Sequence, residues 1–477
     1  MNPADPEELE AISALPQEDD EGEGVGGASS PPLILSWHET FRQESQYMVS
    51  IAFPITAGCV AYMSVGFTCL VLAGHYLNPS EIAGFSLSVL YNDIGGFRLA
   101  SGFTGTVIDT LCTQEYGTDP TSPNVRLHMQ NAIIFVAPIL FLWMLGGFFA
   151  TPILLLFGQV PTVVDAATLC IHTNMLCLAA YVLFEALKRY LQAQNRALPG
   201  MFSMGLAALV NPFLSLYLVR SHGLRGLAVG YGISLSLPAV LLLGYLCFKR
   251  ELPFVFTERP THAKECYCLG LPGIVMGLAE YLVFCYGMVV AGWLGSMPQA
   301  AFSFTLQFGS FLYMVPQGLA GAVVVRVGNL LGEGAPTLAK RATMIITGYA
   351  LLWATAGFTF VLVLHRQIPH FFTVNPAISE IMASCLVIFA PFVFPDTAQA
   401  VSQGVFRGAG RQNVGMWCNL VVFYPFVVPV MTLGTLLWRD TGYGASALWA
   451  TLALGQVVAV GVMIAMVCRM QWRRMTV

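Results

Sequence analysis

Two acidic side chains stand out in this sequence because each is the only acid in a long apolar stretch. Glu280 lies within residues 269–293, and Asp396 lies within residues 381–406. A charged side chain at mid-membrane is energetically costly and usually has a function. A carboxyl group in a low-dielectric surrounding holds its proton more tightly, and a second acid close by strengthens that effect. Two such groups could load a proton on one side of a membrane and release it on the other.

The two acids are expected to lie close together. Their stretches would cross a membrane in opposite directions, which places both carboxyl groups at comparable depth, where they could share one site. The alternative role is structural. In that case the acids hydrogen-bond backbone groups that Pro272, Pro391 and Pro395 leave without their usual partners.

A second polar group lies in the stretch 82–108. Asn92 and Asp93 are followed five residues later by Arg98, the only basic residue deep within an apolar stretch. Two interpretations of the charged pair are open: the two charges neutralise one another, or Arg98 faces a cavity and favours anionic or zwitterionic groups. Aromatic residues such as Tyr313 either belong to interfacial belts or line a cavity, where aromatic faces attract cations.

The composition predicts that these residues lie in a membrane. Of 477 residues, 56% are hydrophobic and 10% are charged, against about 25% charged in a soluble domain. Windows of about 20 apolar residues, the length that crosses a bilayer core, occur twelve times. They cover residues 47–74, 82–108, 130–150, 166–192, 199–219, 226–247, 269–293, 299–325, 342–364, 380–405, 414–437 and 444–468. We therefore expect an all-α integral membrane protein with twelve transmembrane helices.

The twelve spans fall into two halves built on one pattern. Residues 77–117 match residues 294–334 at a constant offset of 217 residues, and a glycine closes each copy. Six spans in each half mean that both halves start on the same side of the membrane, so the repeats are parallel. Two parallel six-helix lobes around a central cavity indicate a transporter, because one lobe can rock against the other and give alternating access.

Charge assigns the two sides of the membrane. If the N-terminus is cytoplasmic, the inner segments hold 17 of the 22 basic residues and the outer loops hold 4, in agreement with the positive-inside rule. Both termini are then cytoplasmic. The chain divides into an acidic, disordered tail (1–46), an N-lobe (47–248), a basic linker (249–268), a C-lobe (269–468) and a short basic C-terminus (469–477).

The remaining residues that could bind metals do not form a recognisable site. The 12 cysteines are scattered without a C-x-x-C pair, and most of the 8 histidines lie at or near loops. We expect no cofactor, no metal and no nucleic-acid partner. We also expect the chain to act as a monomer in the lipid bilayer.

Four motifs give the chain a family resemblance. They are DTLCTQEYG at 109–117, KRYLQAQNRALP at 188–199, RVGNLLGEG at 326–334 and GVFRGAGRQNVG at 404–415. Over residues 47–470 the chain resembles the eukaryotic branch of the multidrug and toxic compound extrusion family, MATE. The resemblance implies export of organic cations or other amphipathic compounds in exchange for protons. The membrane would be the plasma membrane or that of a vacuole or vesicle.

The resemblance also implies roles for particular residues. Glu280 and Asp396 match acids of the eukaryotic pattern that carry proton coupling. The chain departs from the animal members at Cys285 and Gln307, where those members tend to have further acids, and this weakens the case for dicationic substrates. We predict that coupling and substrate binding involve Glu280, Asp396, Gln307, Asn92, Asp93 and Tyr313.

Other functions remain open. A flippase for lipid-linked oligosaccharides is one alternative, although such flippases usually have a strongly basic cavity, and an organic anion exporter is another. An integral membrane acyltransferase would need a nucleophile or a histidine base inside the membrane, where only His172 is available. Sodium is a less favoured coupling ion than the proton.

The repeat also predicts a gate. At the offset of 217, Asp109 is the repeat equivalent of Arg326, and both lie at the inner ends of their spans. Equivalent residues near the axis of parallel repeats approach one another, so an ion pair between these two residues would latch the cytoplasmic side shut. The alternative is that each charge serves its own lobe, with Asp109 bonding nearby helix ends and Arg326 pairing with Glu333 or with backbone carbonyls.

Overall fold

The structure is a computed structural model that describes five parts of the chain. These parts are residues 37–156, 159–253, 263–373, 375–437 and 444–472. They are almost entirely helical, and they contain no strand. Within them, ten helical stretches are long and apolar enough to cross a membrane. The chain is therefore an all-α integral membrane protein, as predicted.

The first half of the chain forms six spans. Its helices are α2 (Trp37–Tyr76), α3 (Pro79–Asn92), η1 (Asp93–Ala100), α4 (Ser101–Val107), η2 (Ile108–Cys112), α5 (Thr113–Thr118), α6 (Asn124–Phe148), α7 (Ala150–Leu156), α8 (Pro161–Ala193) and α9 (Leu198–Lys249). The pieces from α3 to α5 follow one another directly and make the second span. Helix α9 contains two spans because its direction changes at Gly223, whose φ of 57° suits glycine best.

The second half forms six further spans. Its helices are α10 (Ala263–Trp293), α11 (Ser296–Gly332), α12 (Pro336–Leu364), η3 (Ile368–Phe371), α13 (Pro376–Gly408), α14 (Gln412–Val422), η4 (Phe423–Val427), α15 (Val428–Leu437) and α16 (Gly444–Cys468). The pieces α14, η4 and α15 make one continuous span. Of the ten stretches, α9 counts as two spans, and the broken helix from α3 to α5 adds one more, so the described residues form the twelve transmembrane helices that the sequence predicts.

Local sequence signals start several of these helices. A proline occupies the first position of α3, α12 and α13, where its missing N–H would have no partner in any case. Asn375 caps α13 by accepting a hydrogen bond of 3.0 Å from the backbone N–H of Ala377. Before α3, the Glu81 side chain accepts a hydrogen bond of 3.0 Å from the backbone N–H of Asn78. These signals set where the spans begin.

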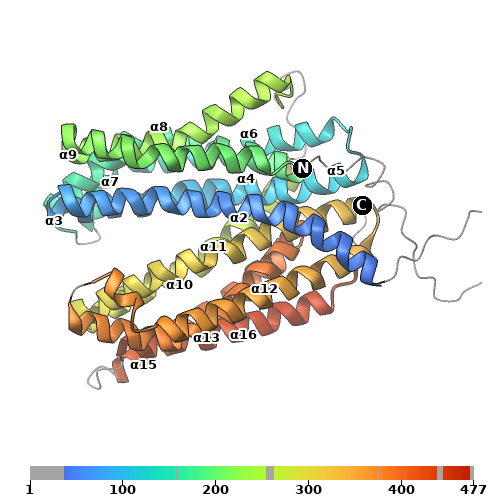
Figure 1. Cartoon of the computed structure of the whole chain (residues 1–477). Helices are drawn as coiled ribbons and strands as arrows, with labels where there is room; N and C mark the ends of the chain where they lie inside the picture. The colour runs from blue at the N-terminus through green and yellow to red at the C-terminus, as the bar shows by residue number, and fades with distance from the viewer. Residues whose placement is uncertain (1–36, 157–158, 254–262, 374, 438–443, 473–477) are drawn as a thin grey trace, which may run out of the picture.

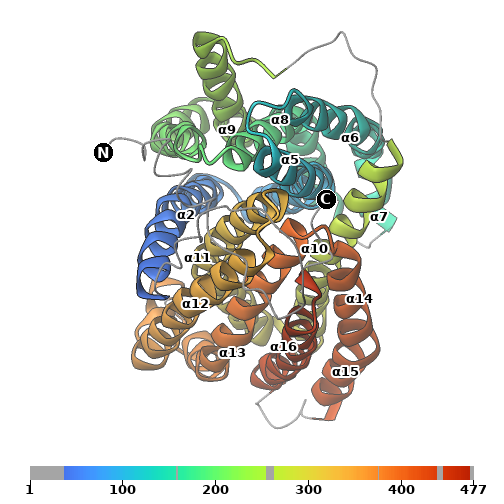
Figure 2. The same cartoon turned by 90° about the vertical axis from the view of Figure 1, so that its right-hand side faces the viewer.

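The helices form two lobes. Figure 1 shows α2 to α9 in one lobe and α10 to α16 in the other, and the ribbons of the two lobes diverge towards one end of the molecule. Helix α2 begins and α16 ends at the opposite end. Near that end α2 and α5 pack against α11 (Figure 2). Helix α4 also packs against α10. The lobes are therefore closed against each other at the end where the described chain begins and ends.

The apolar core follows the same division. One buried cluster consists mainly of N-lobe residues and includes Cys266 and Ile274 of α10, and a second lies within the C-lobe. A third joins the lobes at the closed end, where Met48, Ile51 and Ile55 of α2 pack with Val323 and Val327 of α11. Each lobe thus has a core of its own, which lets it move as a body.

Two helix boundaries differ from those predicted. Helix α2 begins at Trp37, so residues 37–46 are helical although the sequence analysis assigned them to the acidic tail. Helix α10 begins at Ala263, within the predicted linker. These segments contain polar and charged residues, so they do not belong to the apolar runs from which the spans were predicted. The rest of the predicted tail (1–36), the central part of the linker (254–262) and the last residues (473–477) lie outside the described residues.

The second span contains two π-helical turns, η1 and η2. Within η1, Gly95 packs directly on the indole of Trp143 in α6, and Gly96 packs on Leu178 in α8. A side chain at either glycine would overlap with these neighbours. The glycine pair therefore allows the irregular turn to lie close to the rest of the N-lobe, and π-helical turns often mark functional sites.

Candidate functional site

Glu280 lies near the middle of α10 and is held by side chains of two other helices. Gln403 Nε2 on α13 donates a hydrogen bond of 2.8 Å to Glu280 Oε2, and Gln456 Nε2 on α16 lies 3.5 Å from Oε1. Both glutamines are buried. The described hydrogen bonds of this carboxylate therefore come from side-chain amides rather than from backbone groups. These two amides fix its orientation inside the C-lobe.

Further amides extend this polar network through the C-lobe. Asn419 Nδ2 on α14 donates a hydrogen bond of 2.8 Å to the carbonyl of Met276, one turn before Glu280. Gln399 Nε2 on α13 lies 3.5 Å from Asn419 Oδ1. Helices α10, α13, α14 and α16 thus share one buried polar layer. The amides of Gln399, Gln403, Asn419 and Gln456 were not predicted from the sequence. Polar residues within apolar spans were the signal that could have found them.

Asp396 lies on the same face of α13 as Gln403, because seven residues make about two helical turns. Its carboxylate interacts electrostatically with that of Glu280. The Tyr313 hydroxyl on α11 interacts electrostatically with both acids. Glu280, Asp396 and Tyr313 thus influence one another electrostatically within the C-lobe, and that they form one coupling site stays a prediction. Gln307 is half-buried on α11, but no hydrogen bond between described residues joins it to either acid.

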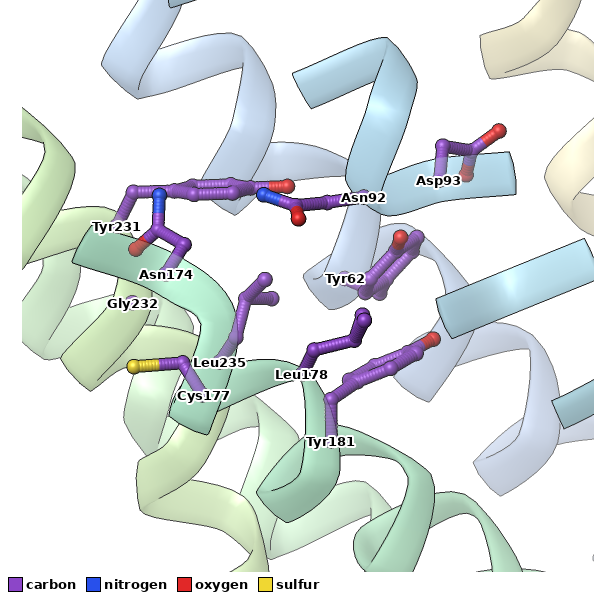
Figure 3. A pocket seen from close by; sticks show the side chains of 10 residues that line it. All are labelled: Tyr62, Asn92, Asp93, Asn174, Cys177, Leu178, Tyr181, Tyr231, Gly232 and Leu235. Carbon is purple, nitrogen blue, oxygen red and sulfur yellow. The ribbon is translucent and has the colours of Figure 1, made fainter. Parts of the chain in front are cut away.

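Asn92 and Asp93 line a pocket within the N-lobe, away from the polar network around Glu280 (Figure 3). The pocket is formed by α2, α8, α9 and the junction of α3 with η1. Its lining includes Tyr62, Tyr181 and Tyr231. Asn92 and Tyr231 point towards one another, whereas Asp93 lies at the other side of the pocket. Asn92 therefore lies inside the N-lobe, away from the acids of the C-lobe, whereas Asp93 also pairs with Arg98.

Asn174 is the residue of this pocket that the sequence analysis missed. It is 2% exposed, and neither its side-chain oxygen nor its nitrogen has a hydrogen-bond partner among the described residues. Tyr62 and Tyr181, at the other side of the pocket, stack with ring centroids 5.3 Å apart. An asparagine within the apolar helix α8 was the available signal. The pocket is lined by polar and aromatic side chains, but its volume of about 10 Å³ is enough for only about one water molecule.

Arg98 connects the N-lobe with the C-lobe. Its Nε lies 3.7 Å from Asp93 Oδ2, and its guanidinium carbon lies 4.3 Å from the ring centroid of Tyr281 on α10. Tyr281 directly follows Glu280 in the sequence. The structure thus places the charged pair of the second span at the interface, beside the principal acid of the C-lobe.

The predicted ion pair between Asp109 and Arg326 does not form, and each residue has other partners. Asp109 Oδ2 lies 2.6 Å from Arg189 Nη1 of its own lobe and 3.5 Å from Arg407 Nη1 of the C-lobe. Arg326 forms a two-point ion pair with Glu44, in which its Nε donates to Oε2 at 2.9 Å. The prediction was wrong because Glu44 had been assigned to a disordered tail, whereas it lies on the helical extension of α2. Both charges nevertheless join the two lobes.

Neutral hydrogen bonds also join the lobes at this closed end. The Thr110 hydroxyl donates to the carbonyl of Arg407 at 2.6 Å, and Gln412 Nε2 donates to the Thr110 hydroxyl at 2.7 Å. Gln114 Nε2 donates to the carbonyl of Gly408 at 3.0 Å. These partners come from the motifs at 109–117 and 404–415. Those motifs therefore build the contact that closes one end of the molecule.

The chain matches known proteins along most of its length. A family model described as MatE matches residues 54–217 and 272–433. Protein DETOXIFICATION 17 of Arabidopsis thaliana is 28% identical over 451 residues, which cover 91% of this chain and 92% of that protein. Multidrug and toxin extrusion protein 1 of Homo sapiens is 26% identical over 441 residues, which cover 91% of this chain and 76% of that protein.

A solved structure shares the fold. The crystal structure of the eukaryotic MATE transporter AtDTX14 matches with a TM-score of 0.85 and 23% identity, over 92% of this chain and 98% of that one. The two six-helix lobes are thus a known arrangement for a transporter. Together with the family model, which covers more than half of the sequence, these findings establish that the chain belongs to the MatE family of multidrug and toxin extrusion transporters.

Proposed function

We propose that the protein is a secondary active antiporter that exports organic cations or amphipathic compounds in exchange for protons. The observation that supports this most directly is the position of Glu280, near the middle of a membrane-spanning helix and oriented by Gln403 and Gln456. An ionisable residue within a membrane is a functional candidate by default. Asp396 and Tyr313 beside it complete the proposed coupling site.

Coupling follows from competition for one carboxylate. A carboxyl group that carries a proton no longer attracts a cation, and a carboxylate that binds a cation has lost its proton. A substrate that binds near Glu280 therefore displaces a proton, and a proton that arrives from the other side displaces the substrate. With Asp396 as a second acid, the site has two carboxyl groups that can bind a proton and a cationic group alternately.

Alternating access supplies the directions of these two movements. The lobes are closed at the end where α2 begins and α16 ends. The positive-inside rule assigns that end to the cytoplasm, so the state described here faces outwards. In this state a proton would reach Glu280 from outside and release the substrate there. Rocking of the lobes would then open the cytoplasmic end for the next substrate.

The proposal includes the cellular setting. We place the protein as a monomer in the plasma membrane or in the membrane of a vacuole or vesicle, with both termini cytoplasmic. Each lobe has its own core, so the proposed movement needs no second subunit. Among the described residues, no group of three or more His, Cys, Asp or Glu residues could hold a metal ion.

The charges at the interface favour this function over a flippase for lipid-linked oligosaccharides. Arg98, Arg189 and Arg407 lie between the lobes, but Asp93 and Asp109 lie within 4 Å of them. A pyrophosphate group would need a cluster of positive charges without acids beside them, whereas each of these three arginines has an acid within 4 Å. The interface offers a mixed pattern of charges instead.

Transport into proteoliposomes tests the proposal. The purified protein is reconstituted, a pH gradient is imposed, and uptake of a fluorescent organic cation is followed with and without sodium. We expect uptake that requires the pH gradient, disappears with a protonophore and is independent of sodium. Uptake that follows a sodium gradient instead would contradict proton coupling.

A further inference from the structure

The π-helical turn η1 creates the contact between Asp93 and Arg98. In an α-helix, residues five apart point about 140° away from one another, because each residue turns the helix by about 100°. The i to i+5 hydrogen bonds of a π-helix put more residues into each turn, so positions 93 and 98 come round to the same side. The 3.7 Å between Arg98 Nε and Asp93 Oδ2 is the result. The turn thus presents both charges to the interface between the lobes.

Arg98 reaches the neighbourhood of the proposed coupling acid from the opposite lobe. Its guanidinium group stacks over the ring of Tyr281 at 4.3 Å, within the range of a cation–π interaction. It also interacts electrostatically with Glu280. The Tyr281 hydroxyl in turn interacts with the Asp93 carboxylate. A cation that belongs to the protein itself therefore occupies an aromatic face beside Glu280.

Arg98 is within reach of a ligand. Its side chain is 29% exposed and that of Asp93 is 23% exposed, whereas Arg326 and Glu44 at the closed end are 4% and 3% exposed. The pair at the closed end is therefore sealed, while the pair near Glu280 is partly exposed. A molecule between the lobes at this depth would meet the Arg98 guanidinium group directly.

This arrangement affects ligands of different charge in different ways. A plain cation that approaches Glu280 meets the like charge of Arg98 and finds the Tyr281 ring already covered. A ligand that carries a carboxylate as well can pair that group with the planar guanidinium, which donates two parallel hydrogen bonds to a carboxylate. The cationic part of the same ligand is then left for Glu280 and Asp396.

We infer that Arg98 makes the site selective for zwitterionic amphipathic compounds, which carry a carboxylate beside a cationic group, over plain organic cations. The inference rests on the proposed function, because it takes Glu280 as part of the substrate site. Asp93 competes with the ligand carboxylate for Arg98. Asp93 therefore determines how much more tightly the site binds a zwitterion than a plain cation.

A matched pair of dyes tests this selectivity. Rhodamine B carries a free carboxylate and is a zwitterion at neutral pH, whereas its ethyl ester has the same fluorophore and is a plain cation. Binding of both to the purified protein in detergent is measured by fluorescence anisotropy. We expect the wild-type protein to bind rhodamine B more tightly than the ester. In Arg98→Gln, the affinity for rhodamine B should fall about tenfold relative to that for the ester, and Arg98→Lys should lie in between, since lysine keeps the charge but lacks the planar fork.

A second variant makes the test independent of the folding of Arg98→Gln. Asp93→Asn removes the competing carboxylate, so its preference for rhodamine B over the ester should increase. A merely structural ion pair would change the binding of both dyes by the same factor in both variants, and that result would overturn the inference. The proposed function is tested separately, because a protein that shows this binding preference but no proton-driven uptake contradicts the transport proposal alone.

Discussion

Asp109 lies between two arginines that belong to different lobes. Its Oδ2 is 2.6 Å from Arg189 Nη1 in the N-lobe and 3.5 Å from Arg407 Nη1 in the C-lobe. At the same end of the molecule Glu44 on α2 pairs with Arg326 on α11. Opening this end would separate Asp109 from Arg407 and Glu44 from Arg326. The closed state is therefore stabilised by charges that face one another across the lobes.

The Glu44 and Arg326 pair predicts a charge-swap result. Glu44→Arg and Arg326→Glu should each depress transport strongly, because each leaves two like charges facing one another in a buried site. Removing one partner of a buried pair costs about 3–5 kcal/mol. The double variant should recover part of the transport, measured as proton-driven uptake into proteoliposomes.

The control is the pair that the repeat suggested. A double variant of Asp109→Arg and Arg326→Asp should stay as inactive as its worse single variant, because these residues do not pair. Recovery in this control without recovery in the Glu44 swap would show that the contacts at the closed end differ from those described.

Asp109 and Arg407 predict unequal effects on stability. Asp109→Asn leaves the guanidinium groups of Arg189 and Arg407 close together without a shared carboxylate. Arg407→Met keeps the 2.6 Å pair with Arg189 intact. We therefore expect Asp109→Asn to lower the thermal unfolding midpoint in detergent more than Arg407→Met, and the double variant to recover part of the loss. Equal midpoints for the two single variants would argue against a shared carboxylate.

Glu280→Gln should abolish transport driven by a pH gradient while the protein still folds. Glutamine keeps the shape of the side chain but binds no proton, so the step that exchanges proton for substrate is lost. Glu380→Gln is the matched control, since Glu380 is exposed near the start of α13. Uptake at the wild-type rate in Glu280→Gln, with normal elution on size exclusion, would remove this residue from the coupling site.

Asp396→Asn should impair transport less than Glu280→Gln does. If the two carboxyl groups titrate as a pair, replacing one changes the pH dependence that remains in the other. The uptake rate is measured across a range of pH in the wild type and in Asp396→Asn. Identical pH profiles in both proteins would mean that Asp396 does not influence coupling.

Gly95→Ala should destabilise the N-lobe. The added methyl group would overlap with the Trp143 indole, which packs directly on this glycine. Overpacking of this kind costs about 1–3 kcal/mol. Gly66→Ala in α2 is the control, because no atom lies within 4 Å of the new methyl group. The thermal midpoint should fall for Gly95→Ala only, and a drop of equal size in both variants would mean that packing at η1 is not the cause.

Much of the architecture could be predicted from the sequence because the membrane imposes simple rules. A span needs about 20 apolar residues, and an isolated acid within such a span is costly. These rules were enough to predict twelve spans, two lobes, and the placement of Glu280 and Asp396 in the same lobe. The motifs at 109–117 and 404–415 were recognised as well, although their role in closing one end of the molecule was not.

The partners of individual charges were decided by the tertiary structure. Glu44 pairs with Arg326 because α2 extends beyond its apolar stretch. The polar residues of this extension give no sign of a membrane span in the sequence. Arg98 meets Asp93 and Tyr281 because a π-helical turn changes the side on which it emerges. Apolar length is a property of a single segment and can be read along the chain. The direction of a charged side chain depends on helix phase and on its neighbours from other helices, and these exist only after the lobes have packed.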